Sequence, residues 1–131
     1  MAQAKSFRGS AFANGTLLVA ANIVNLRGAT VTTSDVSSIS YTVYSLGTRD
    51  FGNRTAVEGH TAVALTVADV LLDTSVTETL NGKSVTYNFM FELDNSEYQP
   101  FPNPGEKYLV RIDFTPVGSY ISPVQIIVET L

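Results

Sequence analysis

The only histidine of the chain, His60, is its one side chain with an ordinary pKa near neutrality, and the chain has no cysteine and no tryptophan. A thiol nucleophile and a thiolate metal site are therefore excluded. A histidine acts as a general base only beside a positioned partner, and the nearest carboxylate in the sequence belongs to Glu58. Because His60 directly follows a glycine, we expect it to lie in a turn beside the surface residue Glu58 and to have no catalytic role.

A cluster of oxygen-bearing side chains, Asp94-Asn95-Ser96-Glu97, is the best candidate for binding a cation. Calcium is held by several oxygen ligands that often come from one loop, but the EF-hand spacing with its central glycine is missing here. We therefore expect a polar loop in which Asp94 or Asn95 bonds its own backbone, with a calcium site as the alternative. Phosphate-binding and hydrolase motifs are missing from the sequence as well, so we expect no enzyme activity, no metal and no cofactor.

The stretch that follows, Tyr98-Gln99-Pro100-Phe101-Pro102-Asn103-Pro104-Gly105, favours a binding loop. Its three prolines lower the entropy that the loop loses on ordering, so Tyr98 and Phe101 could be presented to a partner as fixed aromatic anchors. The alternative is that Phe101 covers the open end of a hydrophobic core and the prolines only brace the return of the chain. The sequence leaves both interpretations open.

Charge and composition exclude several classes of partner. The formal net charge is −4, only 15% of the residues are charged, and the lysines and arginines are scattered along the chain. Binding to nucleic acid needs a basic stripe, so we expect no nucleic-acid partner. No apolar run approaches the roughly 20 residues of a membrane span or forms the core of a signal peptide. The lack of cysteine fits assembly in a reducing cytoplasm.

These side chains must be positioned by β-strands, because apolar and polar residues alternate along most of the chain. The pattern predicts strands over 16–24, 39–46, 85–93, 108–115 and 124–129, shorter pieces over 56–58 and 61–65, and an ambiguous segment over 70–76. No long amphipathic helix is indicated. We expect an all-β protein, namely an Ig-like antiparallel β-sandwich of about seven strands spanning residues 16–131, with other small sandwiches and barrels as alternatives.

Residues 1–15 precede the first predicted strand and read as an extended N-terminal arm. The segment is rich in small and polar residues and ends in the turn signal Asn14-Gly15. Its two aromatic residues, Phe7 and Phe12, indicate that the arm docks either on its own domain or on a neighbouring subunit.

A short pattern that occurs twice in the sequence predicts two helical turns. Residues 31–36 and 65–70 share the order apolar, Thr, two residues, Asp, Val, which resembles a helix N-terminus with a threonine cap and an acidic residue in the first turn. We expect Thr32 and Thr66 to accept free backbone amides at the start of two single helical turns. Asp35 and Asp69 should lie at the positively polarised start of these turns. Both turns should lie at corners where the chain crosses between the two sheets.

Three stretches, DVSSISYTVY (35–44), GHTAVALTVADV (59–70) and YLVRIDFTP (108–116), resemble small phage-like proteins that also occur in some environmental bacterial genomes. The resemblance runs from Ser34 to Thr74 and again over 108–116, which together make up somewhat less than half of the chain. The resemblance implies a viral structural context, and it transfers no functional residue to this chain. It does not include the 94–105 loop or the N-terminal arm.

The sequence analysis therefore predicts a non-enzymatic virion structural or assembly protein, such as a head decoration protein or a head–tail or tail component, assembled in the host cytoplasm. It would act as a homo-oligomer or bound to the capsid or tail, through contacts with other virion subunits, and the candidate contact residues are Phe7, Phe12, Tyr98 and Phe101. The alternative is a glycan- or cell-surface-binding module, in which Tyr98, Phe101, Phe51 or Tyr120 would stack on sugar rings.

Overall fold

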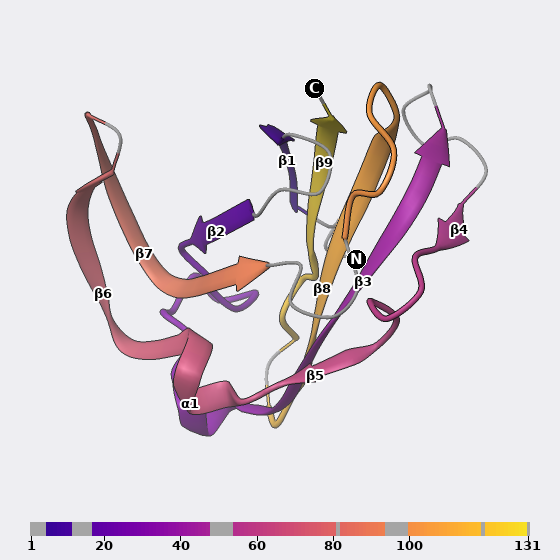
Figure 1. Cartoon of the computed structure of the whole chain (residues 1–131). Coiled ribbons are helices and arrows are strands. Elements are labelled where there is room, and N and C mark those ends of the chain that lie inside the picture. The colour runs from indigo at the N-terminus through magenta and orange to yellow at the C-terminus, as the bar shows by residue number, and fades with distance from the viewer. Residues whose placement is uncertain are drawn as a thin grey trace.

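The computed structural model describes residues 5–11, 17–47, 54–80, 82–93, 100–118 and 120–130, which form an all-β sandwich of two sheets (Figure 1). The larger sheet has the strand order β1-β9-β8-β3-β4, with β5 also paired to β3, and the smaller sheet has the order β2-β7-β6. The predicted all-β sandwich is thus confirmed. The strands in the described residues are β1 Lys5–Ala11, β2 Leu17–Ala21, β3 Val36–Gly47, β4 Thr55–Ala56, β5 Val63–Leu65, β6 Leu71–Leu80, β7 Lys83–Leu93, β8 Lys107–Pro116 and β9 Val124–Thr130.

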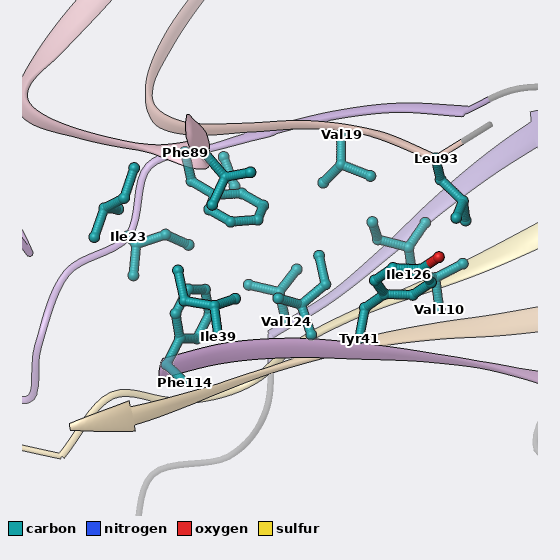
Figure 2. Close-up of a cluster of buried hydrophobic side chains, with 14 of the residues drawn as sticks. Val19, Ile23, Ile39, Tyr41, Phe89, Leu93, Val110, Phe114, Val124 and Ile126 are labelled. Carbon is teal, nitrogen blue, oxygen red and sulfur yellow. The ribbon is translucent and has the colours of Figure 1, made fainter. Parts of the chain in front are cut away.

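One apolar core lies between the two sheets. Figure 2 shows Val19, Phe89 and Leu93 of the smaller sheet facing side chains of the larger one. The rings of Phe89 and Phe114, one from each sheet, meet edge to face with their centroids 5.6 Å apart. These residues belong to the alternating runs of the sequence, because in a strand every second side chain points to the same face.

Both predicted helical turns are present where the chain crosses between the sheets. A 3₁₀ turn, η1 Thr33–Asp35, leads from β2 into β3, and the helix α1 Val67–Val70 leads from β5 into β6. The Asp35 carboxylate accepts the Thr32 amide at 2.9 Å, but Thr66 makes no side-chain capping bond, so its predicted role is wrong. No helix in the part of the chain that the structure describes is long and apolar enough to span a membrane.

The N-terminal segment docks on its own domain, which is one of the two alternatives predicted for the arm. Over Lys5–Ala11 it forms β1, which pairs in parallel with β9 from Lys5 opposite Val124 to Ala11 opposite Thr130. Backbone hydrogen bonds hold a strand of this kind, so the segment needs no alternation of apolar residues to join the sheet. The boundary between an arm and a sandwich at residue 16 therefore does not separate β1 from the larger sheet.

The connection between the last two strands is longer than the predicted turn at 116–119. β8 ends at Pro116 and β9 begins at Val124. Residues 107–112 of β8 pair with β9, with Ile112 opposite Val124. The last residues of β8, up to Pro116, pair with β3 alone. Turn-forming residues mark the start of this connection in the sequence but not its length.

The hairpin of β6 and β7 bends away from the sandwich (Figure 1). The register shifts between the pair Leu71–Phe89 and the pair Val76–Tyr87, which leaves extra residues of β6 at the bend. There the Ser75 hydroxyl donates to Asn22 Oδ1 at 2.9 Å. Beyond the bend, Val76–Leu80 pairs with Lys83–Tyr87, whereas β2 pairs with β7 only over 89–93. We call these two paired strand segments, residues 76–80 and 83–87, the ribbon.

Candidate functional site

An open cleft of about 500 Å³ lies where the loop 100–106 returns over the larger sheet. Strands β3 and β4 and the turn after them form one wall, with Ser45 and Thr55–Glu58. The loop forms the other wall with Pro102, Asn103 and Glu106, and Tyr108 of β8 completes the lining. The pairing of Ser45 with both Thr55 and Tyr108 brings these separate segments together.

Glu106 is the centre of a hydrogen-bond network in this cleft. Its Oε2 atom accepts the hydroxyls of Ser45 and Tyr108, each at 3.3 Å, and the Asn103 side-chain amide at 3.4 Å. The Tyr108 hydroxyl in turn accepts the Asn103 backbone amide at 2.9 Å. Burial, and secondarily the neighbouring Glu106 charge, raise the pKa of Tyr108, so its hydroxyl stays protonated and able to donate.

The backbone of the loop is held just as closely by the end of β9. The carbonyl oxygens of Asn103 and Glu106 lie 2.9 Å and 2.7 Å from the Thr130 hydroxyl oxygen and share its single proton. The Thr130 amide also donates to the Glu106 carbonyl, and Gly105, at φ +78°, donates back to the Thr130 carbonyl. The left-handed conformation at Gly105 favours glycine and lets the chain turn directly into β8.

Among the described residues that line the cleft, Glu58 and Glu106 are the charged ones, and none of these described residues is basic. The nearest arginine along the chain, Arg54, instead lies over the ring of Tyr44, 5.5 Å from its centroid. Lys107, the residue after Glu106, forms an ion pair with Glu129 at 3.8 Å. The cleft is therefore rich in hydrogen-bond acceptors and electrostatically unfavourable for anions.

His60 is buried, with 6% of its surface exposed, and its side chain does not lie in a surface turn as expected. Its Nδ1 atom and the Tyr41 hydroxyl are 2.7 Å apart and share a hydrogen bond. The predicted turn itself is confirmed for the backbone, because the His60 amide donates to the Val57 carbonyl. The side chain turns inward because Tyr41 offers a buried polar partner, and a buried polar group needs one.

The structure also corrects the prediction for Phe101. This ring is fully buried and packs on the ring of Tyr108, with the centroids 5.5 Å apart, as part of the main core. It is therefore not an exposed anchor for a partner, and the alternative interpretation, a cover for the end of the core, applies.

The remaining predicted contact residues are only partly described. The backbone of Phe7 lies in β1 opposite Ile126. Phe12, Tyr98 and Phe51 lie outside the described residues, as does the predicted calcium cluster Asp94–Glu97. Tyr120 is described and is 42% exposed, beside Leu26, whose amide donates to the Tyr120 carbonyl.

Sequence reasoning missed the residues that line the cleft. Ser45 lies in β3, Glu58 follows β4, and Glu106 directly precedes β8, so the three residues come from separate segments of the chain. The one local signal was Gly105, a glycine placed directly before an acidic residue and a strongly alternating strand. The polar lining itself depends on the pairing of β3 with β4 and β8, which no local pattern specifies.

The ribbon is the second candidate site. Unlike the cleft, it lies beyond the part of the smaller sheet that pairs with β2. Its residues Thr77, Glu78, Thr79, Ser84 and Thr86 are exposed. Within it, the hydroxyls of Thr77 and Thr86 are 2.9 Å apart, and the Tyr87 hydroxyl donates to Glu78 at 2.8 Å. This bond to the carboxylate raises the pKa of Tyr87.

No group of three or more histidine, aspartate or glutamate side chains that could hold a metal ion occurs within the described ranges. Comparison with protein-family models, with curated proteins and with solved structures gives no match to this chain. The functional assignment therefore depends on the surfaces of the molecule itself.

Proposed function

We propose that this chain is a non-enzymatic structural subunit of a virion, such as a head decoration protein or a head–tail or tail component, and that it works by contact with other protein subunits. The resemblance of three sequence stretches to phage-like proteins suggests the viral setting. The ribbon supports the mode of action, and it is the observation on which the proposal depends.

The strand order supports describing the sandwich as immunoglobulin-like. In that fold, strands B, E and D form one sheet and strands C, F and G form the other. Here β2, β7 and β6 take the first set of positions, and β3, β8 and β9 take the second. Strand β1 then corresponds to an A strand that pairs with the last strand of the opposite sheet. Sandwiches of this kind often serve as scaffolds for contacts made by edges and loops.

The ribbon offers two open strand edges. On one side, β6 is the edge of the smaller sheet, and on the other side residues 83–87 of β7 extend beyond their pairing with β2. Within the part of the chain that is described, no further strand pairs with either edge. Such edges present backbone donors and acceptors to which another chain can add a strand.

The energetics favour a partner for the ribbon. An isolated two-stranded hairpin is only marginally stable in water, and a third strand or a packed face is needed to stabilise it. Its exposed threonines have high β-propensity and carry no charge that would repel an added strand. A neighbouring subunit that pairs with the ribbon would therefore stabilise it and join the two molecules.

The chemistry of the remaining residues fits a structural role. The only histidine is engaged with Tyr41 in the core, and three backbone groups at Ile23 and Val31 are held by the buried amide of Asn88. In this proposal, Phe7, Phe12 and Tyr98 remain predicted contact residues in addition to the ribbon.

A double variant, Thr79→Lys with Val85→Lys, tests the proposal. Lysines on a strand edge discourage the addition of another strand, and these two positions are not directly opposite each other in the register. We expect the wild-type chain to form oligomers at rising concentration, measured by light scattering after size exclusion. The variant should remain monomeric with a melting temperature within about 2 °C of the wild type.

The matched control adds the same two charges at Ala64 and Ala68, which are exposed on β5 and α1. This Ala64→Lys, Ala68→Lys variant should still assemble. A wild-type chain that stays monomeric at every concentration and does not bind to purified particles of its phage would contradict the proposal, as would a ribbon variant that assembles normally.

A further inference from the structure

The cleft beside Glu106 has the size of a small-ligand site. Its volume of about 500 Å³ lies within the range of pockets that hold small molecules. No residue that lines it belongs to the ribbon, so the proposed assembly role does not account for it. The β3–β4 wall and the ribbon lie on opposite sides of the view in Figure 1.

The lining has unused capacity to accept hydrogen bonds. All three side chains that donate to Glu106 reach its Oε2 atom, and no donor from the described residues reaches Oε1. The exposed carboxylate of Glu58 on the opposite wall makes no hydrogen bond to a described residue. A ligand must therefore bring hydrogen-bond donors to both walls. Its own acceptors can bond the side-chain amide of Asn103 or the Thr55 hydroxyl.

The charge of the lining selects against anions. A phosphate, a sulfate or an acidic sugar would meet two carboxylates, with no compensating cation among the described lining residues. The apolar surfaces of Val57 and Pro102 add contact area for the carbon–hydrogen face of a ring. An uncharged molecule with many hydroxyl groups satisfies all of these requirements.

We propose that this cleft binds a sugar ring of a neutral or amine-bearing glycan. Adjacent hydroxyls, or an amine, donate to Glu58 and Glu106, and the ring lies between Val57 and Pro102. The other donor that fits chemically is a lysine of a neighbouring protein, but a single ammonium group fills little of a cavity of about 500 Å³.

The binding residues on the loop are held in place before a ligand arrives. The Asn103 and Glu106 carbonyls are both bonded to Thr130, and the Tyr108 hydroxyl bridges the Asn103 amide and the Glu106 carboxylate. A preformed site loses little conformational entropy on binding, which matters for weak ligands such as single sugars. The loop prolines act in the same direction.

Titration of the full chain with defined sugars tests the inference. The probes are lactose and chitobiose as neutral sugars, glucosamine as an amine-bearing sugar, sialyllactose as an anionic sugar, and lysine ethyl ester as a lysine analogue. We expect a neutral or amine-bearing sugar to shift the NMR signal of the Asn103 side-chain amide in a saturable manner. Sialyllactose should bind at least about ten-fold more weakly than the best neutral probe.

Two variants connect such binding to the cleft. Glu58→Gln has no hydrogen bond to a described residue to lose, so the fold is retained, and we expect about a ten-fold loss of affinity for the best sugar. Glu106→Gln should give a similar loss. The control Glu92→Gln changes an exposed glutamate of β7 outside the cleft and should bind like the wild type.

Three results would overturn the inference: no saturable shift with any sugar, sugar binding that neither cleft variant weakens, or tighter binding of lysine ethyl ester or sialyllactose than of every other probe. The Thr79→Lys, Val85→Lys ribbon variant should keep sugar binding. Loss of assembly and loss of sugar recognition are thus separate outcomes.

Discussion

At the scale of single residues, polar side chains of this protein hold loops against strands. Asn88, which is fully buried in β7, accepts the Ile23 amide at 2.6 Å and donates to the carbonyls of Ile23 and Val31, each at 3.0 Å. One side chain thereby provides partners for the Ile23 amide and the Val31 carbonyl and a second partner for the Ile23 carbonyl, which also accepts the Val31 amide. The hydrogen bond between the side chains of His60 and Tyr41 connects the turn after β4 to β3.

Asp73 of β6 plays a corresponding part at the surface, and its effect should depend on pH. Its carboxylate accepts the Thr33 amide at 2.8 Å and the Thr33 hydroxyl at 2.9 Å, and these bonds, the amide first, hold its pKa below the ordinary value of 3.8. A carboxyl group with a lowered pKa in the folded state stabilises the fold above its unfolded pKa. This stabilisation is lost as the pH falls through the folded pKa.

We therefore expect Asp73→Asn to melt below the wild type at pH 7, because the variant lacks the charged acceptor. The difference in melting temperature should persist down to about pH 5 and shrink from pH 3.8 downwards, closing as the pH falls through the lower pKa of the folded state, where the wild-type carboxyl becomes protonated too. Thr33→Val removes the hydroxyl donor to Asp73 but keeps the amide donor. In this background, the difference in melting temperature between Asp73 and Asp73→Asn at pH 7 should become smaller without disappearing. A difference that is the same at every pH from 2.5 to 7, measured by circular dichroism, would refute this role of Asp73.

At the scale of elements, the strands differ in how much of their backbone is supported. β8 lies between β3 and β9, so residues such as Val110 and Ile112 have partners on both sides. The two strands of the ribbon pair with each other, and no third strand among the described residues pairs with either of them. The backbone support of the two helical turns is intermediate, because η1 contacts β3 and α1 contacts β6, the strands that they lead into.

Hydrogen exchange should report this difference. Amides of β8 open only when much of the sheet opens, whereas the ribbon can separate locally. We expect the amides of 77–79 and 84–86 to exchange at least about a hundred-fold faster than those of Val110 and Ile112 in the monomer. Equal protection of the ribbon and of β8, in a sample shown to be monomeric, would contradict this expectation.

At the scale of the whole molecule, the packing of the two sheets holds the fold together without disulfides. Phe89 from the smaller sheet is fully buried and meets Phe114 of the larger sheet edge to face. The total stability of a domain of this size is small compared with the sum of its contacts, so the loss of one large inter-sheet contact is a large fraction of it.

Phe89→Ala should lower the free energy of unfolding by about 3–5 kcal/mol, because it removes a buried ring and leaves a cavity between the sheets. The measurement is urea unfolding followed by circular dichroism, with an unchanged dependence on urea. The control Leu18→Ala, at a position 52% exposed, should cost less than about 0.5 kcal/mol. A small loss in Phe89→Ala would mean that the sheets do not depend on this contact.

The sequence alone determined the features that are local. The alternation over 85–93, 108–115 and 124–129 predicted β7, β8 and β9, and the repeated Thr–x–x–Asp pattern located both crossover turns. Side-chain periodicity and turn chemistry are properties of neighbouring residues, so they can be read without knowing the rest of the fold. The two layers followed because strands with one apolar face must cover it.

The tertiary structure decided what depends on segments far apart in the chain. Phe101 is core because Tyr108 lies beneath it, and His60 turns inward because Tyr41 provides a partner. β1 became a strand through the backbone of β9 and not through its own pattern. Burial and strand pairing depend on which residues lie opposite in space. These residues are distant in the sequence, so a local sequence pattern does not identify them.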